Sequence, residues 1–142
     1  MWVRPMEESD IPEICRLENE CFTDSWTEKM VKDMFANELD ETFVAEDGGR
    51  IIGYVNVRII ADEAELMRIC VEKESRGHGT GRLLMERALA AAQAKNVRNT
   101  VLEVRESNKG ARALYEQNGF SEIARREGYY SNPDEAAIIM IR

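Results

Sequence analysis

The stretch SRGHGTGRLL, residues 75–84, places glycines at positions 77, 79 and 81. It lies between a predicted strand, AELMRICV at residues 64–71, and a predicted helix that continues to about Lys95. Glycine lets the backbone approach a ligand closely. The start of a helix presents unpaired N–H groups and the positive end of the helix dipole. This strand–turn–helix unit therefore predicts an anion site suited to phosphate or pyrophosphate.

The spacing of these glycines differs from the patterns of two common phosphate-binding motifs. The P-loop pattern GxxxxGK[ST] is absent from the chain. The dinucleotide pattern GxGxxG fails from Gly77, because position 82 is Arg, and from Gly79, because position 84 is Leu. What remains is R-x-x-G-x-G, starting at Arg76. On glycine content alone, a flexible turn without a ligand stays an open alternative.

Hydrophobic periodicity along the chain predicts an α/β fold, a mixed sheet with helices on both faces. The expected order is β-α-α-β-β-β-α-β-α-β-β, and Asp47-Gly48-Gly49 marks a hairpin between two strands. Asp10 is expected to cap the first helix, and Ser25 or Thr27 the second. The length of 142 residues, without linker or repeat, fits a single domain over residues 1–142.

Composition argues against several classes of function. A net charge of −8 argues against non-specific binding of nucleic acid, and it suits a basic substrate as well as general solubility. The three cysteines form no CxxC pair and there is one histidine, so we expect reduced core thiols and no metal site. No apolar run could cross a bilayer and no signal peptide is apparent, which predicts a cytoplasmic protein without membrane contact.

The turn and several flanking motifs resemble those of one enzyme family. R-x-x-G-x-G followed by Arg-Leu-Leu resembles the acetyl-CoA motif of the GCN5-related N-acetyltransferase (GNAT) superfamily. The resemblance covers nearly the whole chain, including ALYEQNGF at 113–120 and the tail REGYY…AIIM. With WTEK at 26–29 and LEVRESN at 102–108, the chain is most similar to bacterial enzymes that acetylate the N-terminal alanine of a ribosomal protein. This implies a GNAT fold with a splay between its two middle parallel strands.

The resemblance also implies which residues hold acetyl-CoA. Backbone N–H groups of the turn would cradle the pyrophosphate, and the preceding strand would pair with the pantetheine arm. His78 would contribute only its backbone, so its imidazole is not expected to be the base. Asn108 matches a family asparagine that contacts the coenzyme, although on sequence alone it is the better helix cap. The expected coenzyme-binding residues are Ile69, Cys70, Val71, Arg76, Gly77, His78, Gly79, Thr80, Gly81, Arg82 and Asn108.

Glu103 interrupts an apolar strand, TVLEV at residues 100–104, where a buried strand favours Val or Ile. Glu103 and Tyr115 match the general base and general acid of the family. An α-amine, with a pKa of about 7.7–8.0, needs only a modest base, and a phenol can donate a proton to the leaving thiolate. Because positions 103 and 105 share a strand face, an ion pair with Arg105 is the competing interpretation of Glu103. Core packing is the competing interpretation of Tyr115.

Four aromatic residues match positions that flank the peptide groove in the family: Phe22, Trp26, Tyr129 and Tyr130. A plain core role is an even alternative for the first two. The adjacent tyrosines are expected to face opposite sides of their strand. Arg68 and Cys70 depart from the smaller or polar residues often found there, and Gly77 replaces a residue that is often basic, which loosens the assignment of the target.

Three functions remain open from the sequence. The first is acetylation of a protein N-terminus, in particular the N-terminal alanine of a small-subunit ribosomal protein. The second is acetylation of a small amine, such as a polyamine, an amino acid or an antibiotic, by the same fold. The third is a coenzyme-binding module without activity, which the presence of both Glu103 and Tyr115 disfavours. The sequence carries no signal of the oligomeric state.

Overall fold

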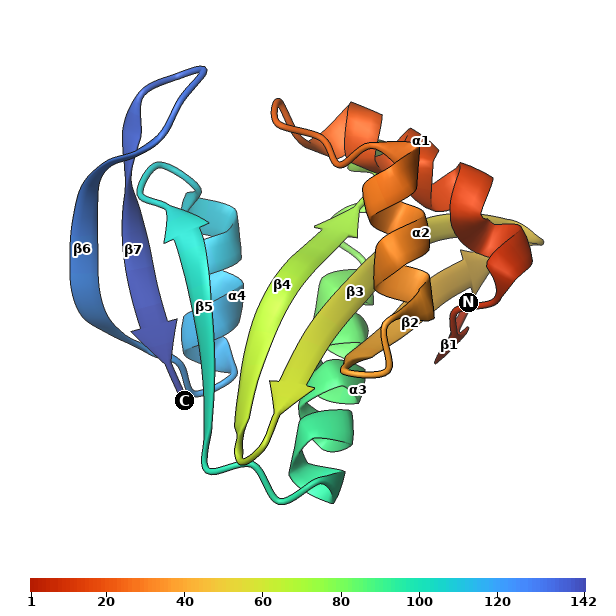
Figure 1. Cartoon of the computed structure of the whole chain (residues 1–142). Coiled ribbons are helices and arrows are strands. Elements are labelled where there is room, and N and C mark those ends of the chain that lie inside the picture. Colours follow the sequence, from red (N-terminus) through yellow and green to blue (C-terminus); the bar gives the residue numbers. More distant parts are fainter.

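One seven-stranded sheet and four α-helices make up the computed structural model, which describes all 142 residues (Figure 1). The strands are β1 Trp2–Pro5, β2 Asp40–Asp47, β3 Arg50–Ile60, β4 Glu63–Val71, β5 Asn99–Arg105, β6 Ser121–Tyr130 and β7 Glu135–Ile141. The helices are α1 Ile11–Cys21, α2 Glu28–Ala36, α3 Thr80–Ala94 and α4 Lys109–Gln117, with short 3₁₀ turns at Glu8–Asp10 and Lys73–Ser75. This order confirms the predicted one.

The sheet has the strand order β1-β2-β3-β4-β5-β7-β6, and only the central β4–β5 pair is parallel. Helices α1 and α2 pack on one face, and α3 and α4 lie on the other (Figure 1). Strand β3 is covered on both faces, which explains why its sequence reads as a nearly continuous apolar run. No helix in the chain is both long and apolar enough to span a membrane.

The central feature is the short pairing between β4 and β5. Only three pairs join the two strands: Glu63 with Asn99, Ala64 with Thr100 and Glu65 with Val101. Beyond these pairs the strands diverge, as Figure 1 shows. Next to the last pair, Asn56 and Val57 of β3 face Arg68 and Leu66 of β4, which leaves Met67 as an extra residue. Such a β-bulge bends a strand, and this one lies where β4 turns away from β5. The predicted splay is confirmed.

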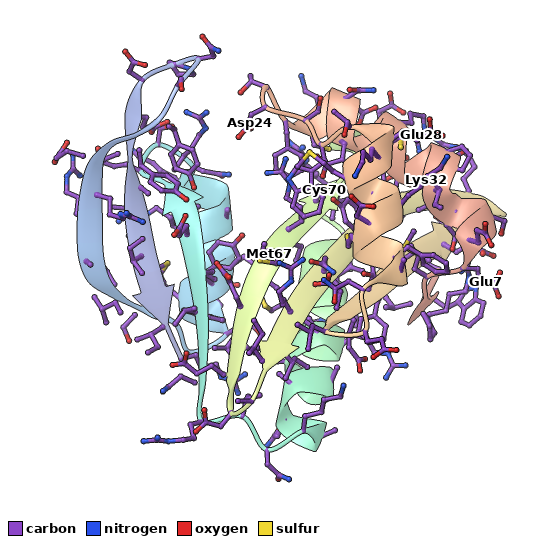
Figure 2. The ribbon with its side chains drawn as sticks, in the orientation of Figure 1. Glu7, Asp24, Glu28, Lys32, Met67 and Cys70 are labelled. Carbon is purple, nitrogen blue, oxygen red and sulfur yellow. The ribbon has the colours of Figure 1, made fainter.

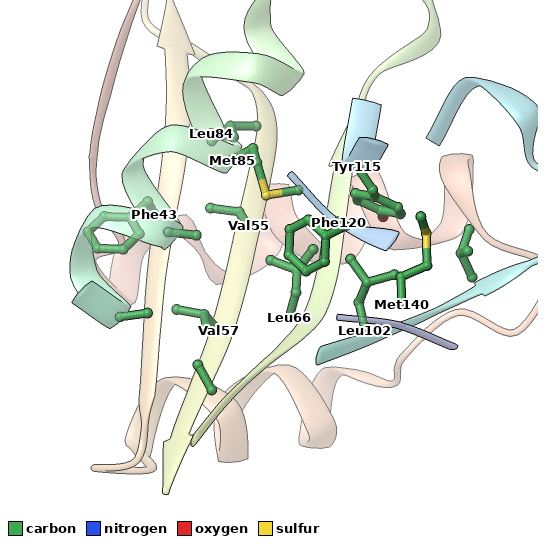
Figure 3. Packing of buried hydrophobic residues seen from close by; sticks show 14 of the residues in the cluster. Phe43, Val55, Val57, Leu66, Leu84, Met85, Leu102, Tyr115, Phe120 and Met140 are labelled. Atoms are coloured by element: carbon green, nitrogen blue, oxygen red, sulfur yellow. The ribbon is translucent and has the colours of Figure 1, made fainter. Parts of the chain in front are cut away.

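Two apolar clusters hold the layers together. A cluster of 18 buried residues lies between the sheet and the α3–α4 face, and Figure 3 shows its packing around Met85, Phe120 and Met140. A second cluster of 10 buried residues joins α1 and α2 to the opposite face. Strand β4 is anchored on both faces, through Leu66 in the first cluster and Cys70 in the second, whereas β5 is anchored on one face through Leu102 and Val104.

Local signals at the helix starts were partly right. Thr27 caps α2, since its Oγ1 accepts a hydrogen bond from the N–H of Met30 at 3.2 Å. Asp10 occupies the N-cap position of α1, as predicted, but its side chain makes no cap bond: its carboxylate accepts bonds from the Arg4 guanidinium at 2.8 and 2.9 Å and from the N–H of Glu7 at 2.8 Å. Asp10 therefore ties β1 to the turn before α1, a partner that local sequence does not reveal.

Gly53 of β3 lies against the backbone of β4. A Cβ there would stand 2.7 Å from the carbonyl oxygen of Cys70, and this backbone atom cannot move without bending β4. We expect Gly53→Ala to lower the free energy of unfolding by about 1–3 kcal/mol, measured by urea denaturation. Gly110→Ala, where nothing lies within 4 Å, is the matched control. A Gly53→Ala protein as stable as the control would contradict the packing described.

Candidate active site

The glycine turn has a backbone that only glycine adopts without strain. Gly77 and Gly79 have φ values of +86° and +82°, and Gly79 is the N-cap residue of α3. The first intrahelical bond runs from the N–H of Leu83 to the oxygen of Gly79 at 3.1 Å. The N–H groups of the residues between them therefore have no helical partner. Together with the helix dipole, they have the geometry and the partial positive charge that an anion site needs.

A cavity of about 470 Å³ opens beside this turn, and we name it the glycine-turn cavity. Its walls come from the turn, from the end of β4, from α4 and from the end of α1. It is lined by Cys21, Phe22, Ile69, Cys70, Val71, Ser75, Arg76, Gly77, Gly79, Thr80, Gly81, Asn108, Gly110, Ala111 and Leu114. Every predicted coenzyme position except His78 and Arg82 is thus brought together; His78 is exposed on the turn and Arg82 is exposed in the first turn of α3.

Several walls of the glycine-turn cavity were not predicted. Cys21 and Ser75 carried no motif, and the three residues from α4 were not among the expected coenzyme-binding residues. Gly81 is constrained in this wall, since a Cβ there would come within 3.4 Å of the Leu114 side chain. Small residues in the walls of this cavity, Gly81 from α3 and Ala111 from α4, therefore leave room for a ligand.

A second cavity, of about 310 Å³, lies between the splayed strands, and we name it the central cleft. It brings together Glu103 of β5 and Tyr115 of α4. Asn108 also lines it, and at the same time caps α4, because its Oδ1 accepts a hydrogen bond from the N–H of Ala111 at 3.2 Å. Capping and cleft lining are therefore compatible at this residue.

Glu103 is not held by the neighbour that the sequence suggested. Arg105 forms its ion pair with Glu135 at 3.3 Å, and it donates hydrogen bonds at 2.9 Å to the carbonyls of Ser131 and Pro133. The cation nearest to Glu103 is Arg126, whose Nη1 lies 3.9 Å away on a side chain that is 60% exposed. Exposed ion pairs at this distance contribute little interaction energy. The Glu103 side chain, 28% exposed, remains accessible from the cleft.

Tyr115 is packed in the core and also lines the central cleft. Its ring is only 6% exposed and packs edge to face on Phe120 at 6.0 Å between centroids (Figure 3). The residue also lines the central cleft. Burial, with a smaller contribution from Tyr130, raises the pKa of the Tyr115 phenol. The hydroxyl is therefore protonated throughout the neutral range and can act as a proton donor.

A third cavity, of about 470 Å³, continues beyond Glu103, and we name it the tyrosine groove. It is lined by Asp24, Trp26, Glu65, Leu66, Met67, Arg68, Glu103, Tyr129, Tyr130, Ser131 and Asn132. The prediction that the two tyrosines face opposite sides is wrong, since their rings meet edge to face at 5.0 Å. Gly128, at φ +61°, lies within a register shift of β6 that interrupts the strand alternation. Of the other predicted aromatics, Trp26 lines this groove and Phe22 lines the other two cavities.

Three carboxylates face the tyrosine groove: Asp24, Glu65 and Glu103. Burial raises the pKa of Glu65, and the nearby charge of Glu103 adds to this shift. Burial and the same carboxylate raise the pKa of Tyr130 to about 12. Figure 2 shows Asp24 on the loop above the gap and Met67 on β4 beside it. The groove therefore suits a positively charged group. Sequence reasoning missed Asp24 and Glu65, because neither belongs to a motif.

The three cavities adjoin one another. The glycine-turn cavity and the central cleft share Cys21, Phe22, Ile69, Asn108 and Ala111. The central cleft and the tyrosine groove share Asp24, Leu66, Met67, Arg68, Glu103 and Tyr130. One passage therefore runs through the splay from the glycine turn to the tyrosine pair, with Glu103 and Tyr115 along it. No group of three or more His, Cys, Asp or Glu side chains is placed to hold a metal ion.

Known proteins similar to this chain agree with this architecture. The model of the acetyltransferase (GNAT) family matches residues 11–120. The [ribosomal protein bS18]-alanine N-acetyltransferase of Escherichia coli (strain K12) is 33% identical over 97% of this chain and 94% of its own length. A Bacillus subtilis (strain 168) relative is 35% identical over 97% of this chain and 92% of its own. The crystal structure of the ribosomal-protein-S18-alanine N-acetyltransferase from Escherichia coli superposes with a TM-score of 0.91, at 31% identity, covering 99% and 91% of the two chains.

Proposed function

Because this chain belongs to the acetyltransferase (GNAT) family and is an acyltransferase, we propose that it acetylates the N-terminal α-amine of a protein. The substrate we favour is the N-terminal alanine of a small-subunit ribosomal protein, by analogy with the named relatives. The observation that carries the proposal is the continuous passage from the anion-binding turn, past Glu103 and Tyr115, to an acidic groove. A ribosomal substrate would imply action in the cytoplasm.

The glycine-turn cavity fits acetyl-CoA. The unpaired N–H groups of Thr80, Gly81 and Arg82 would bind the pyrophosphate. The splay leaves the β4 edge at Ile69–Val71 without a pairing partner on the β5 side, so this edge can hydrogen-bond the amides of the pantetheine arm. When bound, acetyl-CoA supplies the thioester whose acetyl group is transferred.

The chemistry then needs two proton movements, and two residues of the chain can make them. The carboxylate of Glu103 accepts the proton of the substrate amine, directly or through a water, which leaves the nitrogen lone pair free to attack. The phenol of Tyr115, kept protonated by burial, donates its proton to the departing sulfur. Asp24 and Glu65 attract the ammonium form of the substrate into the tyrosine groove, where Phe22, Trp26, Tyr129 and Tyr130 would contact the peptide.

Mass spectrometry with two peptides tests the proposal. The first peptide has a free N-terminal alanine and no lysine, and the second has a blocked N-terminus and one lysine. With acetyl-CoA we expect a product only from the first, because neutralising a lysine at pH 7 costs roughly 3 kcal/mol more than neutralising an α-amine. Acetylation of only the lysine peptide would overturn the proposal, and reaction with neither but with a polyamine would favour a small-amine substrate.

The pH dependence of kcat/KM gives a second test. With the alanine peptide the rate should rise with pH through about 8, since only the neutral amine attacks. A phenol with a raised pKa holds its proton to higher pH than usual, so loss of the acid is displaced above the ordinary tyrosine value. We therefore expect a plateau that extends to about pH 10. An alkaline fall that begins below pH 9 would contradict the assignment of Tyr115.

A further inference from the structure

A buried ionic cluster lies directly beneath the loop between α1 and α2. Glu18, on the inward face of α1, is 0% exposed although its neighbours there are apolar. Its carboxylate accepts hydrogen bonds from Nη2 and Nε of Arg68 at 2.9 and 3.2 Å and from the hydroxyl of Tyr54. Each partner comes from a different element, since Tyr54 belongs to β3 and Arg68 to β4. The charge on Glu18 is therefore fully compensated.

The same two charged side chains hold the loop of residues 22–27. Glu18 accepts a hydrogen bond from the backbone N–H of Trp26 at 2.8 Å, and Arg68 donates one to the carbonyl of Asp24 at 3.0 Å. The Arg68 guanidinium also lies over two aromatic rings, 3.9 Å from the centroid of Phe22 and 4.8 Å from that of Trp26. Every one of these contacts fixes a residue that forms a wall of the passage.

Other ties on the loop are few. Its remaining side-chain hydrogen bond before the α2 cap runs from the Ser25 hydroxyl to Asn19 at 3.0 Å and is exposed, while Phe22 and Trp26 also pack against the cluster under α1 and α2. A buried ion pair by itself is a weak source of stability, because desolvation offsets the attraction. The Arg68–Glu18 pair instead contacts a polar, aromatic loop. A loop that is held in one arrangement before substrate binds loses less conformational entropy on binding.

We propose that Arg68 is a positioning residue that, paired with Glu18, fixes the α1–α2 loop as a preformed wall of the tyrosine groove and thereby sets affinity for the peptide. The effect on peptide affinity rests on the proposed function, whereas the effect on the loop does not. Arg68 lies directly after the bulge at Met67, so the residue that follows the bend in β4 also carries the loop above it.

The test uses the double variant Glu18→Gln/Arg68→Met. Arg68→Met alone leaves an unpaired buried carboxylate and is expected to fold poorly, whereas removal of both charges avoids this cost. In the double variant we expect the KM for the alanine peptide to rise on the order of tenfold, with kcat and the KM for acetyl-CoA within about twofold of wild type. The control is Arg4→Met/Asp10→Asn, since this pair is similarly buried and lines none of the three cavities.

A second measurement reports on the loop without any substrate. Of the two tryptophans, Trp2 is 57% exposed on β1, so a Trp2→Phe background leaves only the Trp26 signal. Adding the double variant should raise the acrylamide quenching constant of Trp26 about twofold, because the loop loses its ties. The Arg4→Met/Asp10→Asn control should leave it unchanged.

The outcomes separate the two proposals. A raised quenching constant together with a raised peptide KM supports the positioning role. Unchanged quenching, or an unchanged peptide KM in an active enzyme, overturns it. If the wild-type enzyme acetylates no peptide, the proposed function fails, while quenching alone still decides whether Arg68 and Glu18 hold the loop.

Discussion

Replacing Glu103 by glutamine is expected to lower kcat by about 10²-fold or more while leaving the affinity for acetyl-CoA nearly unchanged. The amide has the shape of the carboxylate but cannot accept the proton of the attacking amine. Glu103 lines the central cleft and the tyrosine groove but not the glycine-turn cavity, so coenzyme binding should not depend on it. Steady-state kinetics with the alanine peptide and calorimetry with CoA measure the two quantities.

Arg126→Gln is the matched control for Glu103→Gln. It removes the cation nearest to Glu103, at 3.9 Å, without altering the carboxylate, and Arg126 lines none of the three cavities. We expect this variant to keep most of the wild-type kcat. If Glu103→Gln instead leaves kcat unchanged and lowers the melting temperature, Glu103 is a structural ion, and the account of the base is wrong.

Tyr115→Phe is expected to lower kcat by roughly 10²- to 10⁴-fold, the range for loss of a positioned proton donor. The ring remains, and with it the edge-to-face contact with Phe120, so the change in the free energy of unfolding should stay below about 1 kcal/mol. A rate measurement and a urea denaturation curve on the same preparation separate the two effects.

Tyr129→Phe removes a phenol from the same region and serves as its control. Tyr129 is 44% exposed and lines the tyrosine groove but not the central cleft. Its loss should alter peptide KM more than kcat. If the Tyr115→Phe variant retains the wild-type kcat, the proton reaches the leaving thiolate from solvent, and the role of Tyr115 is limited to packing.

The framework of the site could be predicted because its signals are local. The glycine turn, the cap at Asn108 and the out-of-place Glu103 each stand in short motifs, and the order of the elements follows from periodicity. Given a parallel β4–β5 pair, these motifs had to meet at its splay. The splay itself was expected only from family resemblance, and the bulge at Met67 beside it has no sequence signature.

What escaped prediction depends on partners distant in the chain. Asp10 was expected to cap α1, but Arg4 takes its carboxylate. Arg105 was the suspected partner of Glu103, but it pairs with Glu135, thirty residues away. Arg68 stood out only as a departure from the family pattern, because its partner Glu18 lies fifty positions earlier in the chain.

In the proposed function, one passage brings the thioester of acetyl-CoA together with an N-terminal α-amine. Calorimetry with covalent conjugates tests it most directly. In one conjugate the CoA sulfur is joined through an acetyl linker to the α-nitrogen of an alanine peptide, and in the other to the ε-nitrogen of a lysine in a blocked peptide. We predict that the first binds about 10²-fold or more tightly than CoA and that the second binds no more tightly than CoA. An α-linked conjugate that binds no better than CoA, or an ε-linked one that binds more tightly, would contradict the account.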